Sequence, residues 1–70
     1  MKKDKEIICQ YLLDTVQATG ADIADIKYCC DEVTDDAFVN ITWTNGYTKS
    51  VDVTADSGIA MIKDVLRHIA

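Results

Sequence analysis

The spacing of hydrophobic residues changes along this chain, and each change marks a predicted element. Between residues 4 and 19 apolar side chains recur at helical spacing, which predicts an amphipathic helix. Gly20 follows at the position of a left-handed C-cap, and Cys9 and Leu13 lie at the margin of the apolar arc. The predicted apolar stripe consists of Ile8, Tyr11, Leu12 and Val16.

From residue 24 onward the period becomes two, as expected for β-strands with one buried and one wet face. Alternation is interrupted by the polar, acidic segment 32–36, and then resumes in two further stretches. The residues predicted to point inward are Ala24, Ile26, Tyr28 and Cys30 in the first strand, Ala37, Val39, Ile41 and Trp43 in the second, and Tyr47, Lys49, Val51 and Val53 in the third.

The connection between the second and third strands contains Asn45-Gly46, a strong signal for a two-residue hairpin loop. That loop would place Ile41 opposite Ser50, so the apolar faces of the two strands would disagree. A three-residue loop over residues 44–46, with Gly46 in a left-handed bulge position, makes the faces agree. We therefore predict that Trp43 pairs with Tyr47, Ile41 with Lys49, Val39 with Val51, and Ala37 with Val53.

The last segment predicts a second helix that begins at Asp56 or Ser57 as N-cap and runs to the C-terminus. Its apolar stripe is predicted to consist of Ile59, Ile62, Leu66 and Ile69, widened by Met61 and Val65. Helix, three strands and helix follow in order, so both helices can pack on one sheet face. The predicted fold class is α+β, a two-layer sandwich with a three-stranded antiparallel sheet, formed by a single domain over residues 1–70.

This layout leaves the opposite sheet face exposed and rich in hydroxyl and carboxylate groups. Threonine suits exposed strand positions without any ligand, so this composition has a purely structural explanation. The functional interpretation is a flat polar platform for a partner protein, with Phe38 as an anchor. The predicted face consists of Asp25, Lys27, Asp31, Asn40, Thr42, Thr44, Thr48, Ser50, Asp52 and Thr54, with Cys29 and Phe38 as apolar exceptions.

Acidic residues outnumber basic ones by twelve to seven, which gives a net charge of −5. Phosphate contacts need clustered lysine and arginine, so the charge argues against direct binding to nucleic acid. The acids are also concentrated locally, because residues 22–36 contain one basic side chain, Lys27. The acids of this stretch are Asp22, Asp25, Asp31, Glu32, Asp35 and Asp36.

The N-terminal residues are charged and no continuous apolar region follows them, so we expect neither a signal peptide nor a membrane span. The chain has three cysteines without repeated spacing, which is a poor disulfide framework and favours buried, reduced thiols. These features predict a cytoplasmic protein.

Candidate catalytic and metal-binding groups are few. His68 has no nucleophile or orienting carboxylate placed beside it by the sequence, which favours a surface histidine. The acids of segment 31–36 lack the glycine and the bidentate glutamate of a calcium loop, which favours a solvated acidic connection. We therefore expect no enzymatic activity, no cofactor and no metal.

The predicted order of elements resembles the double-stranded RNA-binding domain, whose binding depends on basic residues at the start of its second helix. Here that position reads Asp56-Ser57-Gly58-Ile59, so the resemblance does not extend to RNA binding. In size, acidity and predicted topology the whole chain is similar to the small anti-CRISPR proteins of phages and mobile elements. Several of those are compact αβ folds that occupy the nucleic-acid site of a nuclease with carboxylates.

This resemblance implies a non-enzymatic inhibitor that presents an acidic, nucleic-acid-mimicking surface to a basic partner protein. Carboxylates at strand ends and loops can follow the spacing of phosphates and speed association electrostatically. An alternative is an assembly module that forms a homodimer through an edge strand or the open sheet face. The predicted partner-binding residues are Asp22, Asp25, Asp31, Glu32, Asp35, Asp36, Phe38 and Asp52.

Overall fold

The computed structural model describes residues 2–70, and Met1 of the predicted domain lies outside the described residues. Two helices flank three strands in the chain, which confirms the predicted α+β class. The elements are α1 (Lys2–Ala18), β1 (Ile23–Cys30), β2 (Ala37–Trp43), β3 (Thr48–Asp52) and α2 (Gly58–Ile69). Neighbouring strands are antiparallel and the sheet order is β1-β2-β3.

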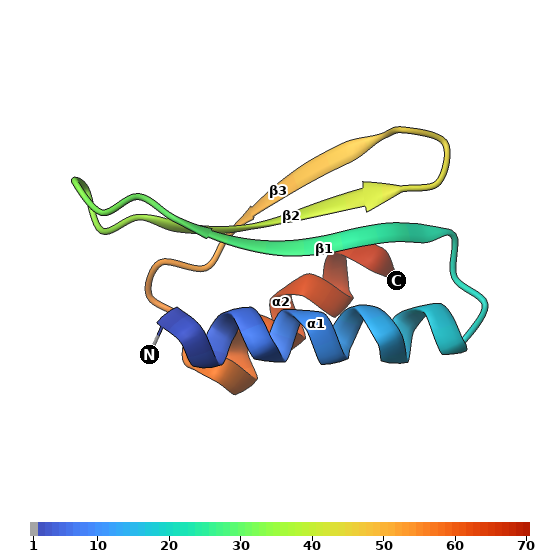
Figure 1. Cartoon of the computed structure of the whole chain (residues 1–70), viewed down its shortest axis with the longest axis horizontal. Helices are drawn as coiled ribbons and strands as arrows, with labels where there is room; N and C mark the ends of the chain where they lie inside the picture. The colour runs from blue at the N-terminus through green and yellow to red at the C-terminus, as the bar shows by residue number, and fades with distance from the viewer. Residues whose placement is uncertain (1) are drawn as a thin grey trace.

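A single hydrophobic core joins one face of the sheet to buried side chains of both helices. Figure 1 shows α1 and α2 on the same side of the sheet. Burial of this apolar surface is the main favourable contribution to folding. The buried residues are Cys9, Leu12, Val16, Ile23, Ile26, Tyr28, Ala37, Val39, Ile41, Val51, Val53, Met61 and Val65.

The hairpin between β2 and β3 has the predicted three-residue loop. Val39 pairs with Val51 and Ile41 with Lys49, as the agreement of faces requires. The loop is closed by the amide of Trp43, which donates to the carbonyl of Tyr47 over 2.8 Å. Gly46 has a φ of +92°, the left-handed conformation that the bulge needs. The rings of Trp43 and Tyr47 pack with centroids 5.3 Å apart, which confirms the aromatic pair at this end.

Replacing Gly46 tests how much the hairpin depends on this backbone conformation. Gly46→Val is expected to lower the free energy of unfolding by about 1–2 kcal/mol, since a Cβ disfavours the left-handed region. No atom lies within 4 Å of the position that a Cβ would take, so the cost comes from the backbone and not from a clash. Urea unfolding measures this loss in the free energy of unfolding. Gly46→Asn is the control and should lose less, because asparagine tolerates positive φ. Equal losses for the two variants would contradict this explanation.

The faces that the helices bury differ from the predicted stripes. In α1 the buried line is Cys9, Leu12 and Val16, whereas Tyr11 is 69% exposed. In α2 the side chains of Met61 and Val65 are fully buried, and two residues of the predicted stripe, Ile59 and Leu66, are 71% and 40% exposed. Each apolar arc is wider than the line that a sheet can cover, so packing selects which part of the arc is buried. The N-cap of α2 is Ser57, whose hydroxyl accepts a hydrogen bond from the amide of Ala60.

The start of β1 also departs from strict alternation. Ala24 was predicted to point inward, but it is exposed and Ile23 is buried instead. The pairing with β2 shifts between Ile23 and Asp25, so Ala24 is an extra residue at this point of the strand. An extra residue in one strand reverses the inward and outward positions that precede it. From Asp25 to Cys30 the pairing is regular.

Candidate protein-binding surface

The connection between β1 and β2 is an acidic loop held in shape by its own hydrogen bonds. One carboxylate oxygen of Asp31 accepts from the amides of Val33 and Thr34, over 2.9 and 3.4 Å. The amide of Asp31 donates to the carbonyl of Asp36, and the amide of Asp35 donates to the carbonyl of Asp31, both over 2.8 Å. Asp35 adopts a φ of +63°, a conformation that aspartate tolerates better than most residues. The Asp31 side chain thus serves mainly to shape the loop.

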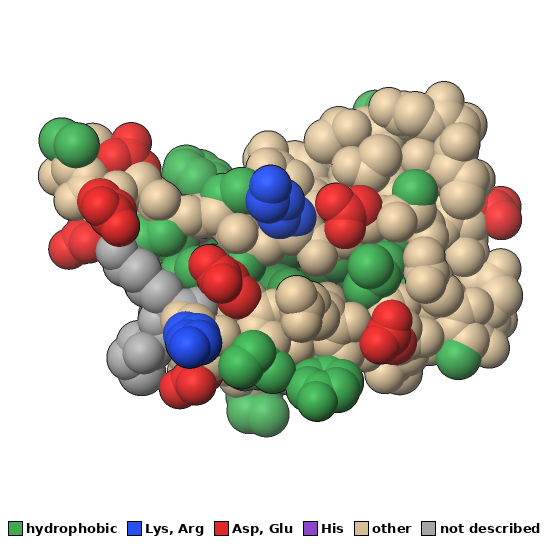
Figure 2. All heavy atoms as spheres, viewed as in Figure 1, with side chains coloured by type: hydrophobic (Ala, Val, Ile, Leu, Met, Phe, Trp, Pro, Cys, Tyr) green, Lys and Arg blue, Asp and Glu red, His purple; other side chains and the backbone are tan. Residues whose placement is uncertain are grey.

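The remaining acids of this loop surround an exposed apolar tip. Glu32, Asp35 and Asp36 are exposed, and Val33 between them is 93% exposed, more than any other large hydrophobic residue in the described chain. Figure 2 shows the acidic side chains gathered around a hydrophobic one at the end of the molecule where β1 joins β2. Sequence reasoning passed over Val33. Its only signal was a single valine within a polar, acidic segment.

Phe38 and Asp52 lie on the outer sheet face close to the acidic loop. Phe38 pairs with Cys29 on one side and with Asp52 on the other, and its side chain is half-buried. The Asp52 carboxylate accepts from the hydroxyl and the amide of Thr54, over 2.7 and 3.0 Å. These hydrogen bonds hold the pKa of Asp52 below its ordinary value. Asp52 therefore stays ionised, but one of its carboxylate oxygens is already engaged in both hydrogen bonds with Thr54, just after β3.

Two of the predicted site residues, Asp22 and Asp25, lie at the other end of β1. Asp25 pairs with Thr42, whereas the acidic loop follows the pair of Cys30 and Ala37. The five residue-to-residue steps from Asp25 to Cys30 separate the two ends by about 17 Å at the usual rise of a strand. The structure therefore divides the predicted set. Asp31, Glu32, Asp35, Asp36, Phe38 and Asp52 share one end of the sheet, and Asp22 and Asp25 do not belong to it.

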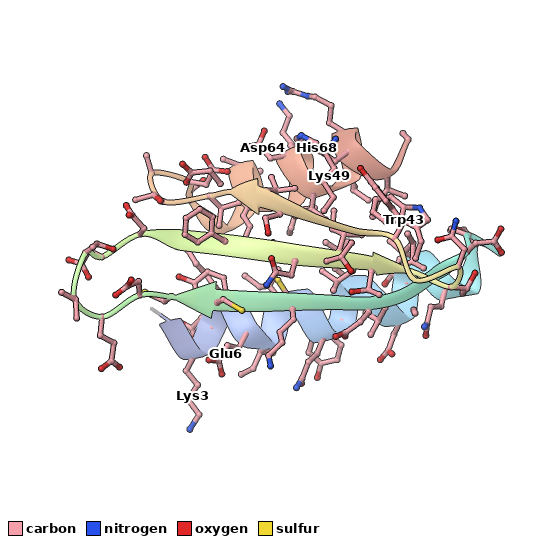
Figure 3. All side chains as sticks on the ribbon, turned by 90° about the horizontal axis from the view of Figure 1, so that it is seen from above. Lys3, Glu6, Trp43, Lys49, Asp64 and His68 are labelled. Carbon is pink, nitrogen blue, oxygen red and sulfur yellow. The ribbon has the colours of Figure 1, made fainter. Side chains whose placement is uncertain are left out.

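The hydroxyl and amide groups in the middle of the outer face bond mainly to one another. Figure 3 looks onto the sheet from above and shows these side chains along the three strands. Ser50 donates to the side-chain oxygen of Asn40 over 2.5 Å, and Asn40 donates to the sulfur of Cys29 over 3.5 Å. The hydroxyls of Thr42 and Thr48 lie 3.5 Å apart. Cross-strand pairs of this kind stabilise a sheet without any ligand.

The groups most often used in catalysis are engaged in the fold. A ring nitrogen of His68 lies 2.7 Å from the carbonyl of Asp64, one turn earlier in α2. Burial, together with the nearby Cys29, raises the pKa of the Cys9 thiol to about 11, which keeps it protonated and a poor nucleophile. Cys29 and Cys30 are only half-buried, so the prediction of buried thiols holds for Cys9 alone.

The described residues contain no group of three or more side chains suited to hold a metal ion. Among the helices of residues 2–70, none has the length and apolar character needed to cross a membrane.

A pair of carboxyl groups that sequence reasoning missed joins Asp56, just before α2, to Asp64 in the second turn of that helix. One oxygen of the Asp56 carboxyl group is buried without a hydrogen-bond partner of good geometry. The Asp64 carboxyl group is close enough to raise the pKa of Asp56, and desolvation and the charge of Asp52 act in the same direction. Lys5 opposes this shift, and its ammonium group donates to the backbone carbonyl of Asp56 over 2.7 Å. Asp56 and Asp64 are eight positions apart in the chain, so no local sequence pattern indicates that they form a pair.

Asp56→Asn is expected to increase stability at neutral pH. A carboxyl group whose pKa is raised on folding binds its proton more tightly in the folded state. Its contribution to stability therefore falls as the pH rises from the unfolded pKa, about 3.9, through the folded pKa. The variant has no titrating carboxyl group at this position. It should therefore be more stable than the unchanged chain at pH values above this range, and the difference should vanish at pH values below it. Urea unfolding at acidic and neutral pH measures the difference, and a variant less stable at neutral pH would contradict the prediction.

Comparisons of this chain with protein-family models, with curated proteins and with solved structures gave no significant match.

Proposed function

We propose that this chain is a non-enzymatic protein-binding inhibitor whose acidic loop, residues 31–36, docks on a basic surface of its partner. The proposal rests on one observation, namely that different residues of the loop fix its shape and form its exposed surface. Asp31 and the backbone amides fix its shape, while Glu32, Asp35 and Asp36 lie exposed around Val33. A preshaped loop loses less conformational freedom on binding than a flexible one.

The chemistry of the loop fits a basic groove better than a flat apolar surface. Carboxylates near a strand end can take the places of phosphates on lysine and arginine side chains. The net charge of −5 would speed encounter with such a partner. Val33 adds an apolar contact at the centre of the charged ring, where water is excluded most easily. A nuclease of the CRISPR type is the partner that the resemblance to anti-CRISPR proteins implies, and inhibition would follow from occupation of its nucleic-acid site.

Parallel affinity capture tests this proposal. The unchanged chain and the Asp35→Lys/Asp36→Lys variant serve as baits for a lysate that contains nucleic-acid-processing complexes. We expect a basic nucleic-acid-binding protein that is held by the unchanged chain at low salt, is released as salt rises, and is absent from the variant. Its activity on nucleic acid should fall when the unchanged chain is added. Recovery of the same proteins by both baits would contradict the role of the loop.

A further inference from the structure

The β1 edge of the sheet is open. In the part of the chain that the structure describes, β1 is the first strand of the order β1-β2-β3 and bonds to β2 alone. It is also the longest strand, with eight residues. An open edge presents unpaired amides and carbonyls to which another strand can bond.

The pairing with β2 shows which backbone groups face outward at this edge. In an antiparallel pair every second residue exchanges hydrogen bonds with its partner strand. The amide of Asp31 donates to the carbonyl of Asp36, just beyond the end of the β1–β2 ladder. Continuing back along β1 by twos, Cys29, Lys27 and Asp25 also bond to β2. The backbone groups of Ile26 and Tyr28 therefore point to the open edge.

Two opposite charges flank Ile26 on the outer face of the same strand. Asp25 and Lys27 are both exposed and point to the same side of the sheet. We propose that the β1 edge binds a second copy of this chain, antiparallel, with Ile26 opposite Ile26 of the second copy. In this register Asp25 faces the second copy's Lys27, and Lys27 faces its Asp25. Moving the register by one step in either direction would set Lys27 against Lys27 or Asp25 against Asp25.

The geometry of the ladder strengthens this charge pairing. Ile26 and its copy would form a hydrogen-bonded pair, so Asp25 and the opposing Lys27 would form the closer, non-hydrogen-bonded pair. Like charges directly opposite each other destabilise a ladder, and opposite charges stabilise it. The register with Ile26 at the centre is therefore favoured over its neighbours.

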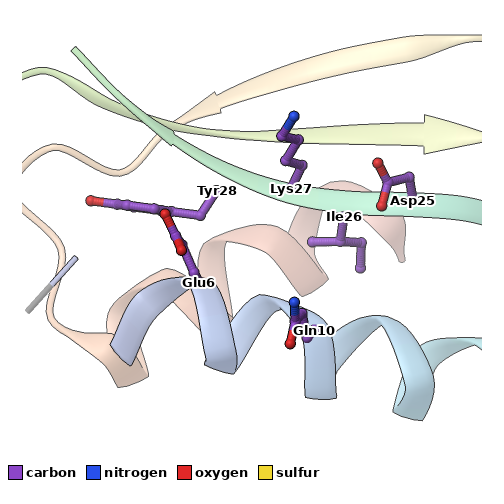
Figure 4. Close-up of a pocket in the computed structure, with 6 residues that line it drawn as sticks. All are labelled: Glu6, Gln10, Asp25, Ile26, Lys27 and Tyr28. Carbon is purple, nitrogen blue, oxygen red and sulfur yellow. The ribbon is translucent and has the colours of Figure 1, made fainter. Parts of the chain in front are cut away.

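The surface beneath the edge offers further contact area. An open groove of about 350 Å³ lies between α1 and β1, and Figure 4 shows that Gln10 lies below Ile26 within it. On α1, the next residues after Glu6 and Gln10 of this groove are Ile7 and Tyr11, which are 43% and 69% exposed. Figure 2 shows hydrophobic side chains on this part of α1. The twofold axis through Ile26 would bring α1 and its copy together under the joined strands.

The dimer does not depend on the proposed function. The acidic loop lies at the end of β1 beyond Cys30, away from the central residues of the interface. Asp35→Lys/Asp36→Lys should therefore leave the dimer intact. Failure of partner binding and failure of dimerisation can thus be told apart.

Sedimentation equilibrium from micromolar to millimolar concentration tests the proposal. We expect a monomer–dimer equilibrium that Lys27→Asp weakens about tenfold or more, because two attractive pairs become repulsive. The charge swap Asp25→Lys/Lys27→Asp should restore dimerisation, since it recreates both pairs. Lys63→Asp, at an exposed position of α2, makes the same change in net charge and should have no effect. Circular dichroism confirms that each variant is folded.

Three results would overturn the proposal. A chain that stays monomeric throughout would mean that Lys27 and the irregularity at Ala24 keep the edge unpaired. A dimer that Lys27→Asp leaves unchanged would lie on another surface. A swap variant that remains as weak as Lys27→Asp would exclude the register centred on Ile26.

Discussion

Ile41→Ala is expected to lower the free energy of unfolding by about 2–5 kcal/mol, the usual cost of truncating a large buried aliphatic side chain. Ile41 has no exposed surface and lies in the central strand, paired with Ile26 on one side and Lys49 on the other. A domain of 70 residues has a total stability of about 4–10 kcal/mol. The variant should therefore unfold at much lower urea concentration, or be largely unfolded without urea.

Ile59→Ala provides the matched control, because it removes the same atoms from a residue that is 71% exposed. Its free energy of unfolding should stay within about 0.5 kcal/mol of the unchanged chain. The comparison also tests which face α2 buries, since the hydrophobic stripe had predicted that Ile59 belongs to the core. Similar losses for the two variants would mean that α2 is rotated about its axis relative to the structure.

Asp35→Lys/Asp36→Lys is expected to weaken binding of the basic partner about tenfold or more. Like charges brought together at an interface cost up to several kcal/mol, and a factor of ten in affinity corresponds to about 1.4 kcal/mol. Most of the effect should be seen in the association rate and in the dependence on salt, since both charges lie on an exposed loop. Surface plasmon resonance with the captured partner, at several salt concentrations, measures both quantities.

Asp14→Lys/Asp22→Lys changes the net charge by the same amount at two exposed positions outside the loop. If the loop forms the binding surface, this control should weaken binding far less than the loop variant. It also tests the division of the predicted site, since Asp22 lies at the end of the sheet opposite the loop. Equal losses for the two variants would show that binding follows total charge, and that no defined site exists on this end of the sheet.

The hairpin shows how much local pattern can establish. Two alternating strands with a single apolar face admit only pairings in which inward residues meet, so the agreement of faces selected the three-residue loop over the loop suggested by Asn45-Gly46. The structure confirms the pairing of Val39 with Val51. The pairing of β2 with β3 could be predicted without the helices, because the two strands are adjacent in the chain and their register is set locally.

The buried face of each helix could not be predicted from the local pattern. The period of the apolar residues correctly placed α1 and α2, but not the line that each buries. In α2 two residues of the predicted stripe, Ile59 and Leu66, are exposed, while Met61 and Val65, which were predicted only to widen the stripe, are buried. A helix can rotate by part of a turn and still present an apolar side to the sheet, so its final orientation depends on contacts with distant residues.

The sequence by itself determined the order of the elements, the register of the hairpin and the polar character of the outer sheet face. These depend on side-chain period and on neighbours along the chain. Only the tertiary structure decided which acids lie together. It left Asp22 and Asp25 at one end of the sheet, gathered the acidic loop around Val33 at the other, and brought Asp56 next to Asp64. Distances between residues far apart in the chain depend on how strands and helices pack, so they cannot be predicted from a local sequence pattern.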